Sequence, residues 1–216
     1  MSALLQVAVL VENHAYDVME FQRMLDSFSD CKCYVQPVDL FVQDENRKKY
    51  DTVFWYNINW DPPQKDGVLL KYLENEIGGT KQGIVIIHHA LLNFQNWEPY
   101  TQICGLKERG ANVGFKYTQN ETVQTHIEDS GHPITRGIPD FAVIDETYQI
   151  GEPEEPGNTI LLSTDNKTSI HNLAWTRQYK NSRVFAYASG HDGKVYTDEN
   201  YRTIVNRALR WSAGRI

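Results

Sequence analysis

The sequence has few cysteines: Cys31, Cys33 and Cys104 are the three thiols in 216 residues. An odd number of cysteines without a C-x-x-C pair excludes the disulfide framework that stabilises small secreted domains. A secretory signal is also lacking, because the first apolar segment has no basic residues before it and ends at Glu12. These absences predict free thiols in a cytoplasmic protein.

Long hydrophobic runs and basic clusters are missing as well. No apolar run approaches the roughly 20 residues of a membrane-spanning helix, so no membrane partner is expected. The formal net charge is −7, and lysine and arginine do not cluster, which argues against a nucleic-acid surface. Low-complexity segments and internal repeats are absent. We therefore expect a single domain over residues 1–216.

The most informative segment that is present runs from Ile84 to Ile87 and leads directly into His88 and His89. Four consecutive β-branched residues predict a strand that is covered on both faces, in the middle of a parallel sheet. Open α/β sheets bind their ligands beyond the carboxyl ends of such strands. The two histidines are therefore the first candidates for a functional site.

Strands and amphipathic helices alternate over the first half of the chain. Apolar runs predict strands at residues 4–11, 33–37, 50–57 and 84–87. Apolar residues three or four apart predict helices at 17–29 and 64–77, and a further helix is expected at 97–105. This alternation is typical of a doubly wound α/β fold with parallel strands and right-handed crossovers.

The second half is less regular. Glycine and proline recur between residues 110 and 160, which predicts an insertion of short strands and loops at one edge of the sheet. Strand composition returns at 170–176 and 183–187, and a closing helix is expected at 199–212.

Polar residues follow four of the predicted strands. They are Glu12, Asn13 and His14; Asn57 and Asn59; His88 and His89; and Ser189, Gly190, His191 and Asp192. If the four strands are parallel, these groups gather along one edge of the sheet. Several histidines in one crevice are seldom the result of chance, so this convergence indicates a binding or catalytic site.

Five segments, taken in order, carry a resemblance to a known family. They are the first strand closed by His14, IIHHA, HPITRGIPDF followed by DETY, AWTRQYKNSRVFAYASGHD, and the final ALRWSAG. Over essentially its whole length the chain resembles the trehalose-utilisation (ThuA-like) family. That family is similar in fold to the class I glutamine amidotransferases. The resemblance implies a three-layer α/β/α flavodoxin-like domain with a mostly parallel sheet.

The chain departs from the family pattern at the turn before the last strand. Lys180, Asn181, Ser182 and Arg183 stand where the family usually has Gly-Lys-Gly-Arg. The loss of both glycines predicts a changed hairpin and an unchanged site.

The amidotransferases use a cysteine nucleophile on a tight strand-to-helix elbow, activated by a histidine that a carboxylate orients. Here His88 or His89 occupies the elbow, and Cys104 lies beyond the following helix. The resemblance implies that His191 survives as a base, with Asp192 to orient it. A hydrolase that uses Cys104 is a further alternative, which full activity of Cys104→Ser would exclude.

Two other candidates for catalysis are matched by the family. Glu146, in DETY, is expected as a general base or metal ligand, whereas Asp145 suits structural hydrogen bonds better. His14 is expected in the site, with a turn residue as the alternative.

Substrate binding is assigned to residues with aromatic, amide or basic side chains. Trp175 and Tyr148 either stack on a sugar ring or fill the core. Arg177 either binds an anion or pairs with a surface carboxylate. Asn57 joins this group by its position after a strand, and His132, which precedes a proline, either binds substrate or fixes a turn.

Imidazoles beside a carboxylate support two mechanisms. In the preferred one, a metal-free pair transfers protons next to the carbonyl of an oxidised sugar, because histidine titrates near neutral pH. In the other, histidines and Glu146 bind a divalent metal such as zinc, although no H-E-x-x-H spacing supports it. The competing class is a non-catalytic carbohydrate-binding or assembly module. The expected partner is a small-molecule carbohydrate, and a homo-oligomer is expected from the frequency of such assemblies.

Overall fold

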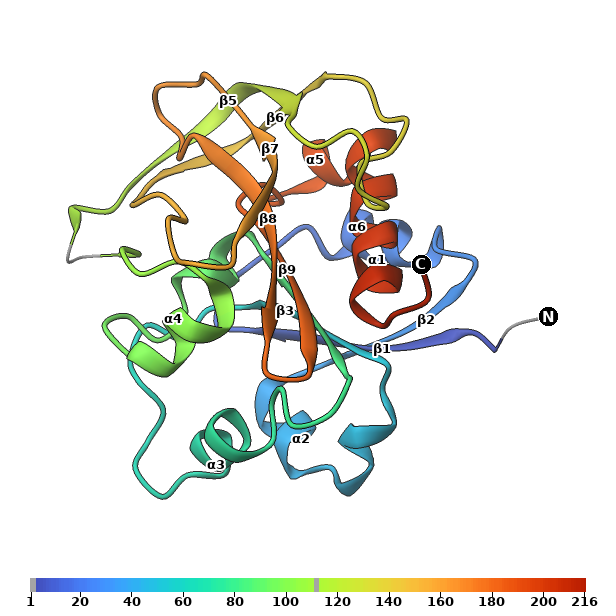
Figure 1. Ribbon diagram of the computed structural model, residues 1–216, viewed down its shortest axis with the longest axis vertical. Coiled ribbons are helices and arrows are strands. Elements are labelled where there is room, and N and C mark those ends of the chain that lie inside the picture. Colours follow the sequence, from blue (N-terminus) through green and yellow to red (C-terminus); the bar gives the residue numbers. More distant parts are fainter. Residues whose placement is uncertain (1–2, 111–112) are drawn as a thin grey trace.

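The computed structural model describes residues 3–110 and 113–216 (Figure 1). Within them, a nine-stranded sheet has the order β2-β1-β3-β4-β9-β8-β7-β5-β6. The strands are β1 (Leu5–Glu12), β2 (Cys31–Gln36), β3 (Thr52–Asn57), β4 (Gly83–Ile87), β5 (Lys116–Ile127), β6 (Phe141–Gln149), β7 (Thr159–Ser163), β8 (Asn172–Tyr179) and β9 (Ser182–Tyr187). The helices are α1 (Val18–Asp26), α2 (Val38–Gln43), α3 (Val68–Asn75), α4 (Glu98–Cys104), α5 (Gly193–Tyr196) and α6 (Glu199–Ser212), with 3-10 helices η1 (Glu45–Lys49) and η2 (His88–Leu92).

The sheet is mixed, which corrects the expectation of a mostly parallel one. Strands β2, β1, β3, β4 and β9 pair in parallel, and β8, β7, β5 and β6 extend the sheet through antiparallel pairs. The connections explain the change of direction. Only Lys180 and Asn181 join β8 to β9, and so short a turn permits antiparallel pairing alone. Lys180 takes a left-handed φ of 50° in this turn.

Residues 113–160 form longer strands than the sequence predicts. β5 has 12 residues and pairs with the nine-residue β6 on one side and with β7 on the other. Half of the side chains of β5 are exposed and most of its residues are polar, so this segment lacks the apolar pattern that predicts a strand. The predicted insertion is therefore an antiparallel extension of the sheet (Figure 1). Residues 111–112 of that insertion lie outside the described residues.

The centre of the sheet agrees with the sequence. Every residue of β3 and β4 is buried, as predicted for strands covered on both faces. Figure 1 shows α2 and α3 on one side of β1 and β3, and α1 and α6 on the other. Helix α6 lies so close to β4 that a Cβ atom added to Gly83 would be 2.5 Å from the Ser212 Oγ. The parallel half is thus a layered α/β arrangement.

Helix boundaries follow local capping. Helix α1 begins after Asp17, whose carboxylate accepts a hydrogen bond from the Glu20 amide, and it ends at Asp26 instead of at residue 29. Helix α3 begins at Val68, four residues later than predicted, after Gly67. The sequence does not predict α2 or α5, because six and four residues are too few to show a helical period.

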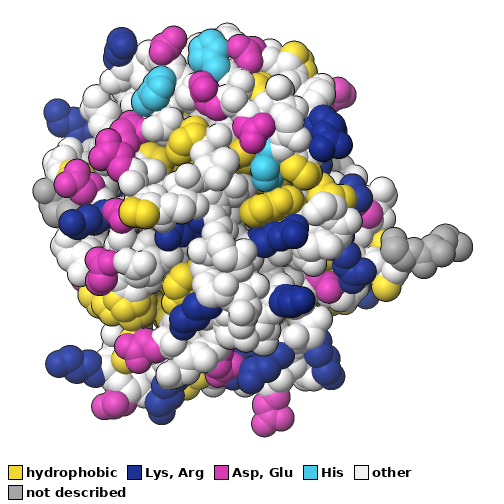
Figure 2. Space-filling model, viewed as in Figure 1, with side chains coloured by type: hydrophobic (Ala, Val, Ile, Leu, Met, Phe, Trp, Pro, Cys, Tyr) yellow, Lys and Arg dark blue, Asp and Glu magenta, His cyan; other side chains and the backbone are white. Residues whose placement is uncertain are grey.

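The expected absence of membrane and nucleic-acid partners is not tested by the structure. No helix in the described part of the chain is long and apolar enough to cross a membrane. Figure 2 shows acidic and basic side chains interspersed over one face of the molecule. The absence of a nucleic-acid partner stays a prediction.

Candidate functional site

Four histidines gather where the parallel strands end. Strands β1, β3, β4 and β9 are adjacent and parallel, so the segments that follow them share one edge of the sheet. His14 stacks on His89 with 4.1 Å between the ring centroids. His191 lies 5.3 Å from His88 and 5.6 Å from His14, measured in the same way. The polar convergence expected from the sequence is present in the fold.

His88 is the elbow residue that follows β4. Its φ is 53°, in the left-handed region that side chains other than glycine seldom adopt. This conformation costs about 1–2 kcal/mol, so it persists only where surrounding contacts hold the residue. The chain therefore makes a tight turn at His88 from β4 into the 3-10 helix η2.

The His88 ring is fully buried and bonded on both nitrogens. Its Nδ1 atom donates to the carbonyl oxygen of Ala188 at 2.7 Å, which leaves Nε2 as the acceptor in the neutral ring. The Tyr148 hydroxyl lies 2.7 Å from that Nε2. Burial raises the pKa of Tyr148 well above its ordinary value, so its hydroxyl stays protonated and donates a hydrogen bond to Nε2. His88 therefore holds Tyr148 in place.

His89 and His14 supply neutral rings. The Nε2 of His89 donates to the carbonyl oxygen of Tyr56 at 3.2 Å, and its buried Nδ1 has no partner among the described residues. Burial, followed by the neighbouring rings of His88 and His14, lowers the pKa of His89 to about 2. Burial likewise lowers the pKa of His14. Both rings therefore stay uncharged at neutral pH, and His89 presents an unused hydrogen-bond acceptor.

Glu146, on β6, lies between two of these histidines. One carboxylate oxygen is 3.5 Å from the Nε2 of His88, and the other is 3.6 Å from the Nε2 of His191. Gln119 on β5 donates to the second oxygen at 3.2 Å. Burial alone would raise the pKa of Glu146, but its contacts with His88 and His191 lower the pKa below the ordinary value. Glu146 is therefore an ionised carboxylate at neutral pH.

Asp145 has a structural role, as the sequence suggests. Its fully buried carboxylate accepts hydrogen bonds from the backbone amides of Gly190 at 2.7 Å, His191 at 3.0 Å and Glu146 at 2.9 Å. Burial raises its pKa, and the hydrogen bonds and the nearby His88 oppose that shift. Asp145 thus ties the loop after β9 to β6, which sets His191 against Glu146.

Replacing Asp145 with asparagine is expected to lower the free energy of unfolding by about 2–4 kcal/mol, because buried amides lose a charged acceptor. Urea unfolding, followed by tryptophan fluorescence, measures this change. Asp192→Asn is the matched control and should cost less than about 1 kcal/mol, because Asp192 is partly exposed. Equal losses in the two variants would show that Asp145 does not hold the loop.

Asp192 does not bond to the ring of His191. The closest approach is 3.8 Å, between its Oδ2 and the Nδ1 of His191, which is too long for a hydrogen bond. Its other oxygen accepts from the Lys194 amide at 2.8 Å and caps α5. The carboxylate that faces the Nε2 of His191 is Glu146.

A cavity of about 260 Å³ opens beside this cluster. Its polar wall comprises His14, His89, Glu146, His191 and Gln119, and its apolar wall comprises Ile58, Trp60, Leu92, Phe115, Tyr117 and Tyr148. His88 does not line it. The volume is near the lower limit of the about 300–1,000 Å³ that is usual for small-molecule pockets. A lining that combines polar side chains with aromatic rings suits one sugar-sized unit, because rings cover C–H faces and polar atoms bind hydroxyls.

Several predicted binding residues lie outside this cavity. Trp175 is fully buried and donates from its indole nitrogen to the carbonyl oxygen of Cys104 at 2.7 Å. Of the two alternatives for Trp175, it therefore fills the core and does not stack on a sugar. Arg177 bonds to the Asn158 side chain at 2.8 Å. His132 packs on Trp211, with ring centroids 5.1 Å apart. Trp175 and Arg177 are both on β8: Trp175 pairs with Ala186 near the carboxyl end of β9, but its side chain is buried in the core, and Arg177 pairs with Val184, further from that end.

Asn57 and Cys104 support the structure around the site. The Asn57 side chain is buried and accepts from the Asn93 amide at 3.2 Å, below the segment that follows β3. Burial raises the pKa of the Cys104 thiol, which is fully buried and lies 3.5 Å from the carbonyl oxygen of Leu106. A buried thiol that keeps its proton is a poor nucleophile.

The sequence did not predict the site residues contributed by β5 and by Phe115, which directly precedes it. Gln119 reaches Glu146, and Phe115 and Tyr117 complete the aromatic wall. Their signal is weak because β5 has polar, exposed composition. Trp60 stands in an aromatic run that the sequence does show, but whether that run lines a site or an interface depends on the fold.

Comparisons with known proteins identify the family and the fold. The family model described as "ThuA: Trehalose utilisation" matches residues 12–212. A ThuA-like protein from Parabacteroides merdae has a TM-score of 0.76 at 18% identity, with 99% of this chain and 91% of that chain covered. The comparison with curated proteins finds no match for the chain.

Two further solved structures share the fold. A protein from Salmonella typhimurium described as cytoplasmic has a TM-score of 0.69 at 11% identity, and the match covers 96% of this chain and 99% of that chain. A Thermoplasma acidophilum protein described as one component of a GMP synthase has a TM-score of 0.61 at 12% identity, covering 99% and 96% respectively. The second likeness shows a fold related to the glutamine amidotransferases, as the sequence implies.

Proposed function

The chain belongs to the ThuA trehalose-utilisation family, and on that premise we propose that it transfers protons next to the carbonyl of an oxidised disaccharide. The observation that carries this proposal is the position of Glu146, an ionised carboxylate on the cavity wall with its two oxygens facing His88 and His191. A carboxylate and an imidazole within one small cavity form the pair that such chemistry needs.

The proposed reaction is an isomerisation made of proton transfers at carbon and at oxygen. Glu146 removes a proton from the carbon beside the ketone, and the C–H electrons form a carbon–carbon double bond while the ketone oxygen gains charge. His191 donates a proton to that oxygen, which gives an enediol. Glu146 then returns its proton to the former ketone carbon, the hydroxyl on the other carbon gives its proton to His191, and the product is an isomeric keto-sugar. The sequence of steps needs no oxidant or reductant.

The remaining residues position the sugar. The buried Nδ1 atoms of His14 and His89 have no partners among the described residues, and both rings line the cavity. Because both rings are neutral, a sugar can pack against them without meeting a charge. Tyr148, which donates to His88, and the exposed Trp60 cover the C–H faces of the ring.

Proton exchange with heavy water tests the proposal. The protein is incubated in D₂O with trehalose that carries one ketone, and deuterium at the adjacent carbon is followed by NMR. We expect incorporation well above the rate in buffer alone. Binding of the sugar without incorporation would favour a non-catalytic carbohydrate-binding module. If the sugar does not bind and no deuterium is incorporated, the proposal is wrong.

A divalent metal is the second candidate, because donor atoms of His88, Glu146 and His191 all lie within 4.8 Å of one another. Two imidazoles and a carboxylate form a donor set that zinc accepts, and zinc would polarise a carbonyl or activate water there. The Tyr148 hydroxyl, however, already occupies the lone pair of the His88 Nε2. The metal-free scheme therefore remains preferred.

Metal content separates the two schemes. Elemental analysis of protein purified without added metal is expected to give far less than one zinc per chain, and chelation should leave the exchange rate unchanged. A transition metal near one per chain, with activity lost on chelation and restored by that metal, would establish the metal site. Tyr148→Phe frees the His88 Nε2 and should increase zinc affinity, which provides a control for the competition.

Location and assembly extend the proposal. We place the protein in the cytoplasm, because its cysteines are free and its Salmonella relative is described as cytoplasmic. We also propose a homo-oligomer, and the mass of the particle in sedimentation experiments tests this.

A further inference from the structure

A second and larger cavity lies beside the histidine cavity. Its volume is about 560 Å³, which is within the usual range for small-molecule sites. The two cavities share Ile58 and Trp60 in their walls. Trp60 is 45% exposed and packs on Phe115, with 5.9 Å between ring centroids. A ligand that extends past Trp60 would therefore reach both spaces.

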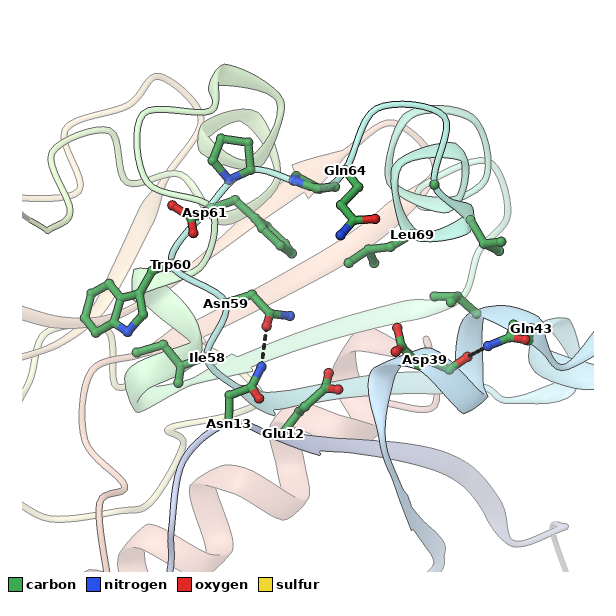
Figure 3. Close-up of a pocket in the computed structure, with 16 residues that line it drawn as sticks. Glu12, Asn13, Asp39, Gln43, Ile58, Asn59, Trp60, Asp61, Gln64 and Leu69 are labelled. Carbon is green, nitrogen blue, oxygen red and sulfur yellow. Dashed lines mark hydrogen bonds between the residues drawn. The ribbon is translucent and has the colours of Figure 1, made fainter.

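The wall between the cavities is held in place by the backbone. The carbonyl oxygens of Asn59 and Trp60 accept hydrogen bonds from the amides of Phe94 at 2.7 Å and Gln95 at 2.9 Å. The Asn13 side chain donates to the Asn59 side chain at 2.6 Å (Figure 3). These bonds fix Trp60 at the border, so the larger cavity is formed before any ligand binds.

Unused hydrogen-bond acceptors face the interior of this cavity. Figure 3 shows the carboxylates of Glu12 and Asp39 pointing into the hollow from one side and the amide of Gln64 from the other. Neither carboxylate has an ion-pair partner in the described part of the chain. Burial, and then the charge of Asp39, raises the pKa of Glu12, as expected for a carboxylate beside a like charge. Paired carboxylates bind adjacent hydroxyl groups well and repel phosphate.

The apolar side of the cavity suits a carbohydrate also. Val42, Leu69 and Phe94 contribute to its lining, and Trp60 contributes an indole ring. Carboxylates opposite an apolar wall match a sugar unit, which has hydroxyls around its rim and C–H groups on its faces. Among the described lining residues there is no lysine or arginine to bind an anion.

We propose that this cavity binds the second sugar unit of a two-unit ligand and that Glu12 and Asp39 restrict that unit to an uncharged one. The inference rests on the proposed function, because it requires the first unit to occupy the histidine cavity. Glu12 and Asp39 then accept hydrogen bonds from neighbouring hydroxyls, and a phosphorylated or acidic second unit is rejected by their charge.

Calorimetric binding of three probes tests this inference: glucose, trehalose and trehalose 6-phosphate. We expect trehalose to bind at least about tenfold more tightly than glucose, because it alone fills both cavities. Gln64→Trp fills the larger cavity and should remove this advantage while leaving glucose affinity unchanged. Leu40→Trp adds the same bulk at an exposed site outside the cavity and should change neither affinity.

The phosphate probe tests the charge. Wild-type protein should bind trehalose 6-phosphate about tenfold more weakly than trehalose, and Asp39→Asn should narrow that gap. Suppose that glucose and trehalose both bind, but Gln64→Trp has no effect or lowers both affinities equally. The larger cavity then does not bind the second sugar unit, and the proposed function stands. If the phosphate binds as well as trehalose, the charge restriction is wrong. If neither glucose nor trehalose binds, the proposed function and this inference fail together.

Discussion

Replacing Glu146 with glutamine is expected to slow deuterium exchange into the keto-disaccharide by about 10²–10⁴-fold. Glutamine keeps the shape of the side chain and its hydrogen bond with Gln119, but it cannot accept a proton from carbon. The loss should appear in kcat more than in KM, because the sugar contacts made by His14 and His89 are retained. NMR measurement of the exchange rate at several sugar concentrations gives kcat and KM separately.

Two further variants make this result specific. Glu74→Gln alters an exposed carboxylate on α3 and should leave the rate unchanged. His191→Gln should lower kcat as well, because it removes the acid that donates to the ketone oxygen. If Glu146→Gln keeps the wild-type rate while His191→Gln is inactive, the base is His191 and the assigned roles are wrong.

Acidification is expected to destabilise the protein by about 2 kcal/mol between pH 7.5 and pH 5 through His89 alone. The pKa of His89 is lowered to about 2 in the folded chain by burial, against about 6.5 in an unfolded chain. Between these values the unfolded chain binds a proton that the folded chain does not. The stabilisation is therefore complete above about pH 6.5 and falls by about 1.4 kcal/mol for each pH unit below it.

Urea unfolding at a series of pH values measures this dependence. His89→Gln has no group that titrates at this position, so its stability should fall less steeply over the same interval, although it is less stable at pH 7.5. His126→Gln is the control: the partly exposed His126 pairs with Asp140 at 2.9 Å, which raises its pKa, so its loss should not flatten the pH profile. Parallel pH profiles for wild type and His89→Gln would show that His89 is accessible to protons in the folded protein.

The parallel half of the fold is readable from the sequence because its signal is local. An uninterrupted β-branched run predicts that β4 is buried on both faces, and the apolar periodicity of residues 199–212 predicts α6 with the same bounds. Burial of a strand or a helix face is visible in its own residues, without knowledge of its neighbours. In the antiparallel half, the strand predicted at residues 170–176 overlaps β8, but β5 was not readable in this way, because it is polar and its partners are distant in the chain.

The residues of the site also fall into those that the sequence predicts and those that it does not. His14, His88, His89 and His191 could be predicted together, because each follows a strand and parallel strands end at one edge. Trp175 and Arg177 could not be excluded, because residues on an antiparallel strand and residues on a parallel one have the same composition.

By itself, the sequence determined the family, the central strands and the edge at which the histidines meet, since these follow from local pattern and strand order. Only the tertiary structure decided that Glu146 sits between His88 and His191, that Asp192 caps a helix, and that a second cavity lies beyond Trp60. Those facts depend on the register of β5 and β6 and on the path of the loop after β3. Register and loop path are set by contacts between residues far apart in the chain, which no local pattern records.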